Sequence, residues 1–257
     1  MPDVEFSTAD HVARVRLNRP KSLNAVTPQM DQALYEAWSE INHNPDIWVA
    51  ILSAEGDRAF CAGADVSGEQ NGSQSRIAFG GGITGVGGPL LILEKPLVAA
   101  VQGYVLGGGF EMTMCADIIV AADTATFGMP ETKAGIMGES GIMHRSIRQL
   151  PYRIAMAMIL TGDRLGAEEA ARHGLVNEVV AADHLLEAAD RWAEKLLAVS
   201  PLAAQAAKHA VLSRLSYPLD VALSTRYEPI EAYATTEDVL EGRRAFSEKR
   251  LPTWSGR

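Results

Sequence analysis

The chain has 257 residues, of which 47% are hydrophobic and 21% charged, a globular composition that excludes intrinsic disorder. Its 32 acidic and 23 basic residues give a formal net charge of −9, which repels a phosphate backbone and argues against nucleic acid as a partner. The longest apolar runs are far too short to cross a bilayer, so we expect no membrane partner.

The two cysteines, Cys61 and Cys115, are far apart in the sequence and have no CxxC spacing. We therefore expect no zinc site and no other metal, and free thiols fit a reducing compartment. The first residues contain neither a basic segment followed by an apolar stretch nor an Arg-rich presequence. Together these features predict a cytoplasmic protein.

Strand and helix signals alternate through the first 130 residues. Residues 13–17 alternate apolar and charged side chains, as a half-buried strand does. Thr27 and Pro28 are typical of a helix start. The apolar stripe expected on that helix is Met30, Leu34, Trp38 and Ile41. Continuous apolar runs predict buried strands at Ile47–Leu52, Leu97–Val101 and Ile118–Ala122. The pattern indicates an α/β class with a largely parallel core covered on both faces.

From about residue 140 the pattern predicts helices. A longer one is expected after Asp183, which would serve as its N-cap. Its expected apolar stripe is Leu186, Ala189, Ala193 and Leu196. The other expected helices are Ser140–Leu150, Arg153–Leu160, Ala167–His173, Pro201–Leu212 and Asp238–Phe246.

Two loops of small residues follow buried strands, where open α/β sheets usually bind ligands. Residues 58–66 read RAFCAGADV, and residues 103–111 read GYVLGGGFE. The Gly107–Gly109 triplet leads into an expected helix at Phe110–Cys115. The unpaired amides of a first helical turn can bind an oxyanion, although close packing alone also explains such glycines.

Two carboxylates accompany these loops. Glu111 falls in the first turn after the glycines, and Glu131 follows twenty residues later. Each could by itself be a helix-dipole partner or a surface residue. Two acids beside two sets of backbone donors form a set that can move protons next to a developing negative charge.

These segments resemble the enoyl-CoA hydratase/isomerase, or crotonase, family. The resemblance runs nearly end to end, from Leu17-Asn18-Arg19-Pro20-Lys21-Ser22-Leu23-Asn24-Ala25 to Phe246-Ser247-Glu248-Lys249. It implies a crotonase-like spiral of ββα repeats in residues 1–195, with the acyl-CoA site, and a helical trimerisation region in residues 196–257. It also implies an acyl-CoA substrate and a homotrimer, or a hexamer made as a dimer of trimers.

The resemblance also implies roles for single residues. The amides of Ala64 and Gly108 would hold the thioester oxygen, and Glu111 and Glu131 match the two acids of the hydratases. The other expected substrate contacts are Lys21, Ala25, Ala62, Asp65, Val66, Gly107, Phe246 and Lys249. The implied activity is a hydro-lyase that adds water to a 2-trans-enoyl-CoA and gives a 3-hydroxyacyl-CoA, as in fatty acid β-oxidation. We expect no cofactor, since coenzyme A arrives as part of the substrate.

One departure keeps a second activity open. After Glu131, simple hydratases of the family continue with Gly-x-x-Pro-Gly-Ala-Gly-Gly, whereas this chain has GIMGESGI at residues 135–142. Glu139 resembles a third acid found in the dienoyl-CoA isomerases, or it is only a partner of the following helix. An isomerase using Glu111, Glu131 and Glu139 is therefore the alternative to the hydratase. A non-catalytic or RNA-binding relative is disfavoured by the acid pair and the negative charge.

The stretch least like the family is residues 67–89, which contains GGGITGVGG at residues 80–88. We expect it to be a flexible loop that forms the wall of the acyl pocket. Cys61 lies beside the first loop, and without a histidine placed to activate it we expect a buried thiol.

Overall fold

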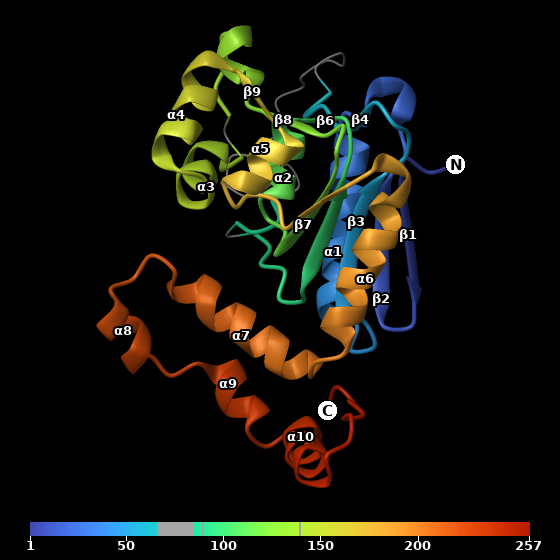
Figure 1. Cartoon of the computed structure of the whole chain (residues 1–257), viewed down its shortest axis with the longest axis vertical. Coiled ribbons are helices and arrows are strands. Elements are labelled where there is room, and N and C mark those ends of the chain that lie inside the picture. The colour runs from blue at the N-terminus through green and yellow to red at the C-terminus, as the bar shows by residue number, and fades with distance from the viewer. Residues whose placement is uncertain (66–84, 89, 139) are drawn as a thin grey trace.

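The computed structural model describes residues 1–65, 85–88, 90–138 and 140–257. Within them lie two β-sheets (Figure 1). The larger sheet has the order β1 (Val4–Ala9), β2 (Val12–Leu17), β3 (Val49–Ala54), β5 (Leu97–Val101), β7 (Ile118–Ala122), β10 (Glu178–Val180). The smaller has the order β4 (Ala59–Cys61), β6 (Tyr104–Leu106), β8 (Thr126–Gly128), β9 (Arg164–Gly166). All neighbours are parallel except β1 with β2 and β8 with β9.

The chain builds the two sheets together, one strand pair at a time. The pairs β3–β4, β5–β6 and β7–β8 each place their first strand in the larger sheet and their second in the smaller. Because β3, β5 and β7 are neighbours in one sheet and β4, β6 and β8 in the other, successive pairs stack as turns of a spiral. The mixed α/β class and the spiral predicted from the sequence are confirmed.

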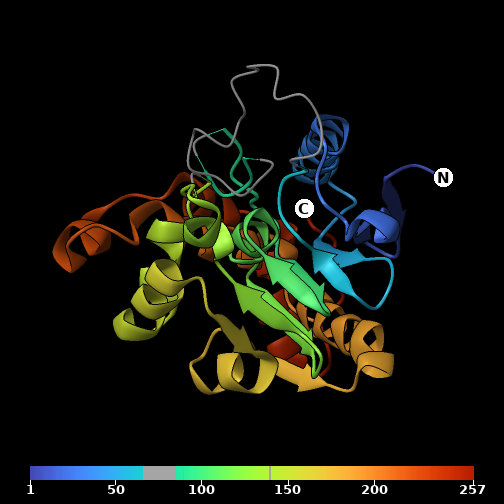
Figure 2. The same ribbon diagram turned by 90° about the horizontal axis from the view of Figure 1, so that it is seen from above.

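Helices cover both faces of the larger sheet, on opposite sides in Figure 2. On one face lies α1 (Pro28–His43), where Thr27 Oγ1 accepts a hydrogen bond from Met30 N at 3.2 Å. All four residues of the predicted stripe are buried there. On the other face, α6 (Leu185–Leu197) packs against β3, β5 and β7. Between the two helical layers, β5 and β7 are therefore apolar throughout, as predicted, and β3 is apolar except for Ser53.

Several predicted elements need correction. The strand expected at Ile47–Leu52 is shifted to Val49–Ala54. Asp183 does not cap α6, because a 3-10 turn at Ala182–His184 precedes the helix and makes His184 its N-cap. Of the stripe predicted on α6, Ala189 and Ala193 are buried and Leu196 packs half-buried against the same cluster. Leu186 is wrong, since it is 55% exposed, and Leu185 and Ala188 are buried instead.

The other helices that the sequence predicted are present, with each end within two residues of the expected one. Three of them follow the site: α3 (Ile142–Gln149), α4 (Tyr152–Thr161) and α5 (Ala167–Arg172). Four helices form the tail: α7 (Pro201–Arg214), α8 (Leu219–Ser224), α9 (Glu228–Tyr233) and α10 (Glu237–Glu248), of which α8 and α9 were not predicted. None of the helices in the described ranges combines the length and the apolar character that crossing a membrane requires.

The tail is fastened to the core through α7 and through the segment after α10, while α8 extends away from it (Figure 1). On α7, Lys208 Nζ donates to Asp117 Oδ2 at 2.6 Å and to Lys95 O at 2.9 Å. After α10, Trp254 packs against the buried cluster that α6 forms with the larger sheet. Within the tail, the fully buried Asp238 of α10 accepts hydrogen bonds from Ser200 Oγ at 2.7 Å and from Ser255 N at 2.9 Å.

Candidate active site

The first half of the site is the segment that leaves β4. Three backbone hydrogen bonds fasten it to residues 23–26: Ala62 N to Leu23 O at 3.0 Å, Val26 N to Gly63 O at 2.9 Å, and Asp65 N to Val26 O at 2.9 Å. Among the described residues, the exposed Ala64 amide has no acceptor. An N–H group held in place without a partner is ready to donate to a ligand.

The second half is the turn from β6 into α2 (Gly108–Thr113). Gly107 has a φ of +52°, which a residue with a side chain rarely adopts, and donates its amide to Gly128 O at 3.1 Å. A β-carbon on Gly109 would lie 2.4 Å from the carbonyl oxygen of Cys61, so only glycine permits this approach of α2 to β4. The Gly108 amide likewise has no acceptor in the described part of the chain.

The two halves meet. A β-carbon on Gly63 would lie 3.3 Å from the Gly108 nitrogen and 3.8 Å from the Gly107 α-carbon. The backbones that carry the amides of Ala64 and Gly108 are therefore adjoining, and both amides are without an internal partner. Two such donors can hold one oxygen atom that gains negative charge during a reaction.

Glu111 lies in α2 and is 3% exposed. Its Oε1 accepts hydrogen bonds from Ser140 N at 3.0 Å and from Ile142 N at 3.1 Å. Burial is the main cause that raises the pKa of Glu111 to about 7; the nearby charge of Glu131 acts in the same direction and these hydrogen bonds oppose it. The carboxyl group is thus oriented by two amides and titrates near neutral pH.

Glu131 lies on the 3-10 helix Pro130–Ala134 and is half-buried. Burial raises its pKa as well. A β-carbon on Gly107 would lie 3.1 Å from Glu131 Oε1. A β-carbon on Gly138 would lie 3.4 Å from Glu111 Oε1 and 3.5 Å from Glu131 Oε1. Both carboxylates therefore approach the same point beside Gly138, which the Ile142 side chain also borders, its Cγ2 lying 2.3 Å from that β-carbon position.

The two acids titrate as a pair. Each is disfavoured as an anion by burial, and ionisation of Glu131 makes ionisation of Glu111 harder. Glu111, with a pKa of about 7, exchanges its proton near neutral pH. The pair can accept a proton with one carboxylate and deliver one from the other.

Other residues that the sequence singled out for the substrate lie beside the first loop. Arg19 Nη1 donates to Ala25 O at 2.6 Å and to Asp65 Oδ2 at 3.0 Å, so the Asp65 carboxylate is engaged by a cation of this chain. Lys21 is exposed and lines a cavity of about 250 Å³ with Pro20 and the turn at residues 55–59. Ala62 and Gly107 lie within the two loops themselves.

Phe246 and Lys249 are not brought to this site. They lie on α10 and at its C-terminal end, at the end of the molecule opposite β4, β6 and α2 in Figure 1. The Phe246 side chain is 89% exposed. Val66, Glu139 and most of the expected pocket wall, residues 67–84 and 89, lie outside the described residues.

The sequence analysis missed the amides of Ser140 and Ile142, which orient Glu111. Their only signal was a pair of glycines, Gly138 and Gly141, before α3. The predicted helix start at Ser140 is wrong by two residues, because Gly141 is the N-cap of α3. The predicted loops are also shorter than expected, since part of each forms the three-residue strands β4 and β6.

The Cys61 thiol takes no part in the chemistry of the site. Cys61 is fully buried, and burial raises the pKa of its thiol to about 12, which removes the thiolate that nucleophilic catalysis requires. The predicted buried thiol is confirmed. Within the described ranges, no group of three or more His, Cys, Asp or Glu side chains could hold a metal ion.

The raised pKa of Glu111 predicts a pH-dependent stability effect. Its carboxyl has a pKa of about 7 in the folded chain, against an ordinary 4.5. As pH rises through this window the unfolded chain loses the proton first, so the folded state loses about 3 kcal/mol of stability. We expect Glu111→Gln to be more stable than the native chain at pH 8, and equally stable at pH 4.5. Urea denaturation at both pH values measures this; equal stability at pH 8 would contradict it.

This chain is similar to a known protein family and to individual enzymes that act on CoA thioesters. The sequence model of the family described as enoyl-CoA hydratase/isomerase matches residues 7–257. A carnitinyl-CoA dehydratase of Salmonella typhi is 38% identical over 251 residues, which are 96% of this chain and 95% of the relative. An (E)-benzylidenesuccinyl-CoA hydratase of Thauera aromatica is 35% identical over 257 residues, 98% of this chain and 99% of the relative.

Solved structures of enoyl-CoA hydratases are also similar to this chain. A chain from Novosphingobium aromaticivorans DSM 12444, provisionally described as a short chain enoyl-CoA hydratase, is 61% identical with a TM-score of 0.93, covering 100% of this chain and 99% of that one. An enoyl-CoA hydratase of Mycobacterium marinum is 35% identical with a TM-score of 0.92, covering 100% of both chains. With the family model matching almost the whole sequence, the chain belongs to the enoyl-CoA hydratase/isomerase family.

Proposed function

We propose that this protein is a hydro-lyase that adds water across the double bond of a 2-trans-enoyl-CoA and releases a 3-hydroxyacyl-CoA. One observation carries the proposal: Glu111 and Glu131 face the same point beside two adjoining amides without internal acceptors. The comparisons support a hydratase of this family acting on a CoA thioester, because the similar proteins are named as hydratases and dehydratases of such compounds.

The geometry supports a separate role for the two amides and for each of the two acids. The thioester oxygen accepts hydrogen bonds from Ala64 N and Gly108 N, which oppose the negative charge that develops on it. One such donor is worth about 2.7–4 kcal/mol of transition-state stabilisation. One carboxylate of the pair removes a proton from water as its oxygen bonds to C3. The other carboxyl delivers a proton to C2, so water is added in full and nothing else is consumed.

We propose 2-trans-enoyl-CoA thioesters as the substrate class, without a single acyl group. The relatives act on quite different acyl groups, as the names carnitinyl-CoA dehydratase and benzylidenesuccinyl-CoA hydratase indicate. What these reactions share is water and a CoA thioester. The reaction therefore needs no cofactor besides the coenzyme A that the substrate carries.

The isomerase alternative depends on Glu139, which lies outside the described residues. Glu111 and Glu131 alone suffice for hydration, whereas the alternative adds a third acid to move double bonds without water. The named hydratases and dehydratases favour hydration.

Substrate assays with acid variants test the proposal. Purified protein is given a short 2-trans-enoyl-CoA and, in parallel, a 3,5-dienoyl-CoA. We expect loss of the conjugated enone absorbance with the first substrate. Glu111→Gln and Glu131→Gln should each lower kcat/KM by about 10²–10⁴-fold, since each removes one positioned acid or base. Exclusive conversion of the dienoyl-CoA, or near-normal hydration by either variant, would refute the proposed mechanism.

We also propose that the chain works as a trimer or as a pair of trimers, with the tail between subunits. The tail exposes large apolar side chains that a single chain leaves in water; examples are Val211, Leu215, Leu219, Leu223 and Phe246. In such an assembly α10 of one subunit would bring Phe246 and Lys249 to the site of another, where they would contact the coenzyme.

Light scattering on the purified protein tests the assembly. We expect the mass of three or six chains at micromolar concentration, because burial of this apolar surface drives association. Leu219→Glu together with Leu223→Glu should lower the mass, as each places a charge in the interface. A single-chain mass for the native protein would contradict the arrangement.

A further inference from the structure

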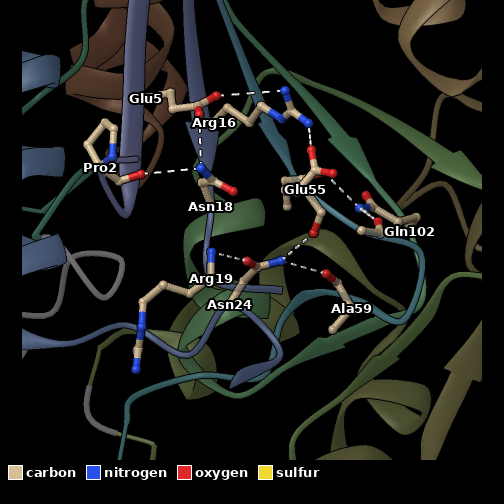
Figure 3. A network of polar contacts seen from close by, with 11 residues as sticks. Pro2, Glu5, Arg16, Asn18, Arg19, Asn24, Glu55, Ala59 and Gln102 are labelled. Atoms are coloured by element: carbon tan, nitrogen blue, oxygen red, sulfur yellow. Dashed lines mark hydrogen bonds and ion pairs between the residues drawn. The ribbon is translucent and has the colours of Figure 1, made fainter. Parts of the chain in front are cut away.

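Asn24 is a fully buried amide between the turn that precedes α1 and the strand that leads to the first loop of the site (Figure 3). Its Nδ2 donates to Ala59 O at 2.9 Å and to Glu55 O at 3.0 Å. Its Oδ1 accepts a hydrogen bond from Arg19 N at 2.8 Å. One side chain thus joins residue 19 to residues 55 and 59, which are distant from it in the sequence.

The chemistry of this position suits asparagine. The backbone at residue 24 has a φ of +53°, a left-handed conformation that asparagine tolerates better than most residues. Both amide hydrogens and the amide oxygen are used. Aspartate would lose the donors, and glutamine would add a methylene to a filled space. Alanine would remove this donor from the buried Ala59 carbonyl and from the part-buried Glu55 carbonyl.

Strand β4 needs this support because its own ladder is weak. It has three residues, and its pairing with β6 shifts register between Ala59 and Cys61. It is also the edge strand of the smaller sheet. The Asn24 side chain holds Ala59 at the start of the strand. Backbone hydrogen bonds of residues 23–26 hold the loop that follows it.

We propose that Asn24 is a positioning residue for the reaction: its hydrogen bond to Ala59 O fixes the start of the segment that ends at the Ala64 amide. The inference rests on the proposed function of that amide as a donor to the thioester oxygen. Asn24 touches no substrate in this account. It sets where Ala64 N lies relative to Gly108 N, and so how well two donors share one oxygen.

Gln102 offers a matched control in the same network (Figure 3). It too is a buried amide whose nitrogen donates to two backbone carbonyls, those of Ala54 at 3.0 Å and Gly56 at 2.7 Å. These carbonyls belong to the last residue of β3 and to the turn after it, not to β4. Gln102→Ala therefore removes the same kind of contact as Asn24→Ala without releasing Ala59.

The experiment measures carbonyl polarisation and turnover together. Butanoyl-CoA labelled with ¹³C at the thioester carbonyl is bound to each protein, and the infrared carbonyl band reports hydrogen bonding to that oxygen. Hydration of a 2-enoyl-CoA is followed separately. We expect the native protein and Gln102→Ala to shift the band to lower frequency. Asn24→Ala should lose most of the shift and lower kcat by about 10- to 100-fold, with KM changed much less.

The outcomes distinguish failure of the inference on Asn24 from failure of the proposed function. A full band shift with kcat equal to that of Gln102→Ala would overturn the inference. If Asn24→Ala does not fold, Asn24→Ser and Asn24→Asp are measured in the same way, and a full shift in either folded variant would overturn it. A native protein that shifts the band but does not hydrate refutes the proposed function alone, and the band then decides the role of Asn24.

Discussion

The site depends on one close approach between two backbones. Gly109 lies so near Cys61 that a β-carbon would come within 2.4 Å of the Cys61 carbonyl oxygen. This contact joins the exit of β4 to the start of α2 and makes the backbones of Ala64 and Gly108 neighbours. The spiral topology makes it possible, because it places β4 beside β6 with the same direction. Two amides without internal acceptors are the chemical result of that packing.

The same packing carries a cost in stability. Burial that fixes Glu111 beneath the loop before α3 also disfavours its ionised form, and two amides from that loop only partly offset this. A buried carboxyl with a pKa of about 7 destabilises the core at neutral pH, but it is well suited to proton transfer. The buried position of Glu111 is thus better explained by a role in proton transfer than by a contribution to the stability of the fold.

Much of this arrangement could be predicted from the sequence, and the exceptions have physical causes. Strands β5 and β7 have the bounds expected, because a continuous apolar run marks a strand buried on both faces. Strands β4, β6 and β8 were missed, since three residues are too few to show a period. The loops and the acid pair followed from local patterns, but the contact of Ser140 with Glu111 and that of Asn24 with Ala59 join distant residues.

In the reaction that we propose, the acid pair and the two amides act together to add water to a CoA thioester. Turnover of a 2-trans-enoyl-CoA in H₂¹⁸O, with mass analysis of the product, tests this. We expect a 3-hydroxyacyl-CoA that carries ¹⁸O on C3 and retains its thioester. A shifted double bond without ¹⁸O, or a free acid with ¹⁸O in its carboxylate, would contradict it.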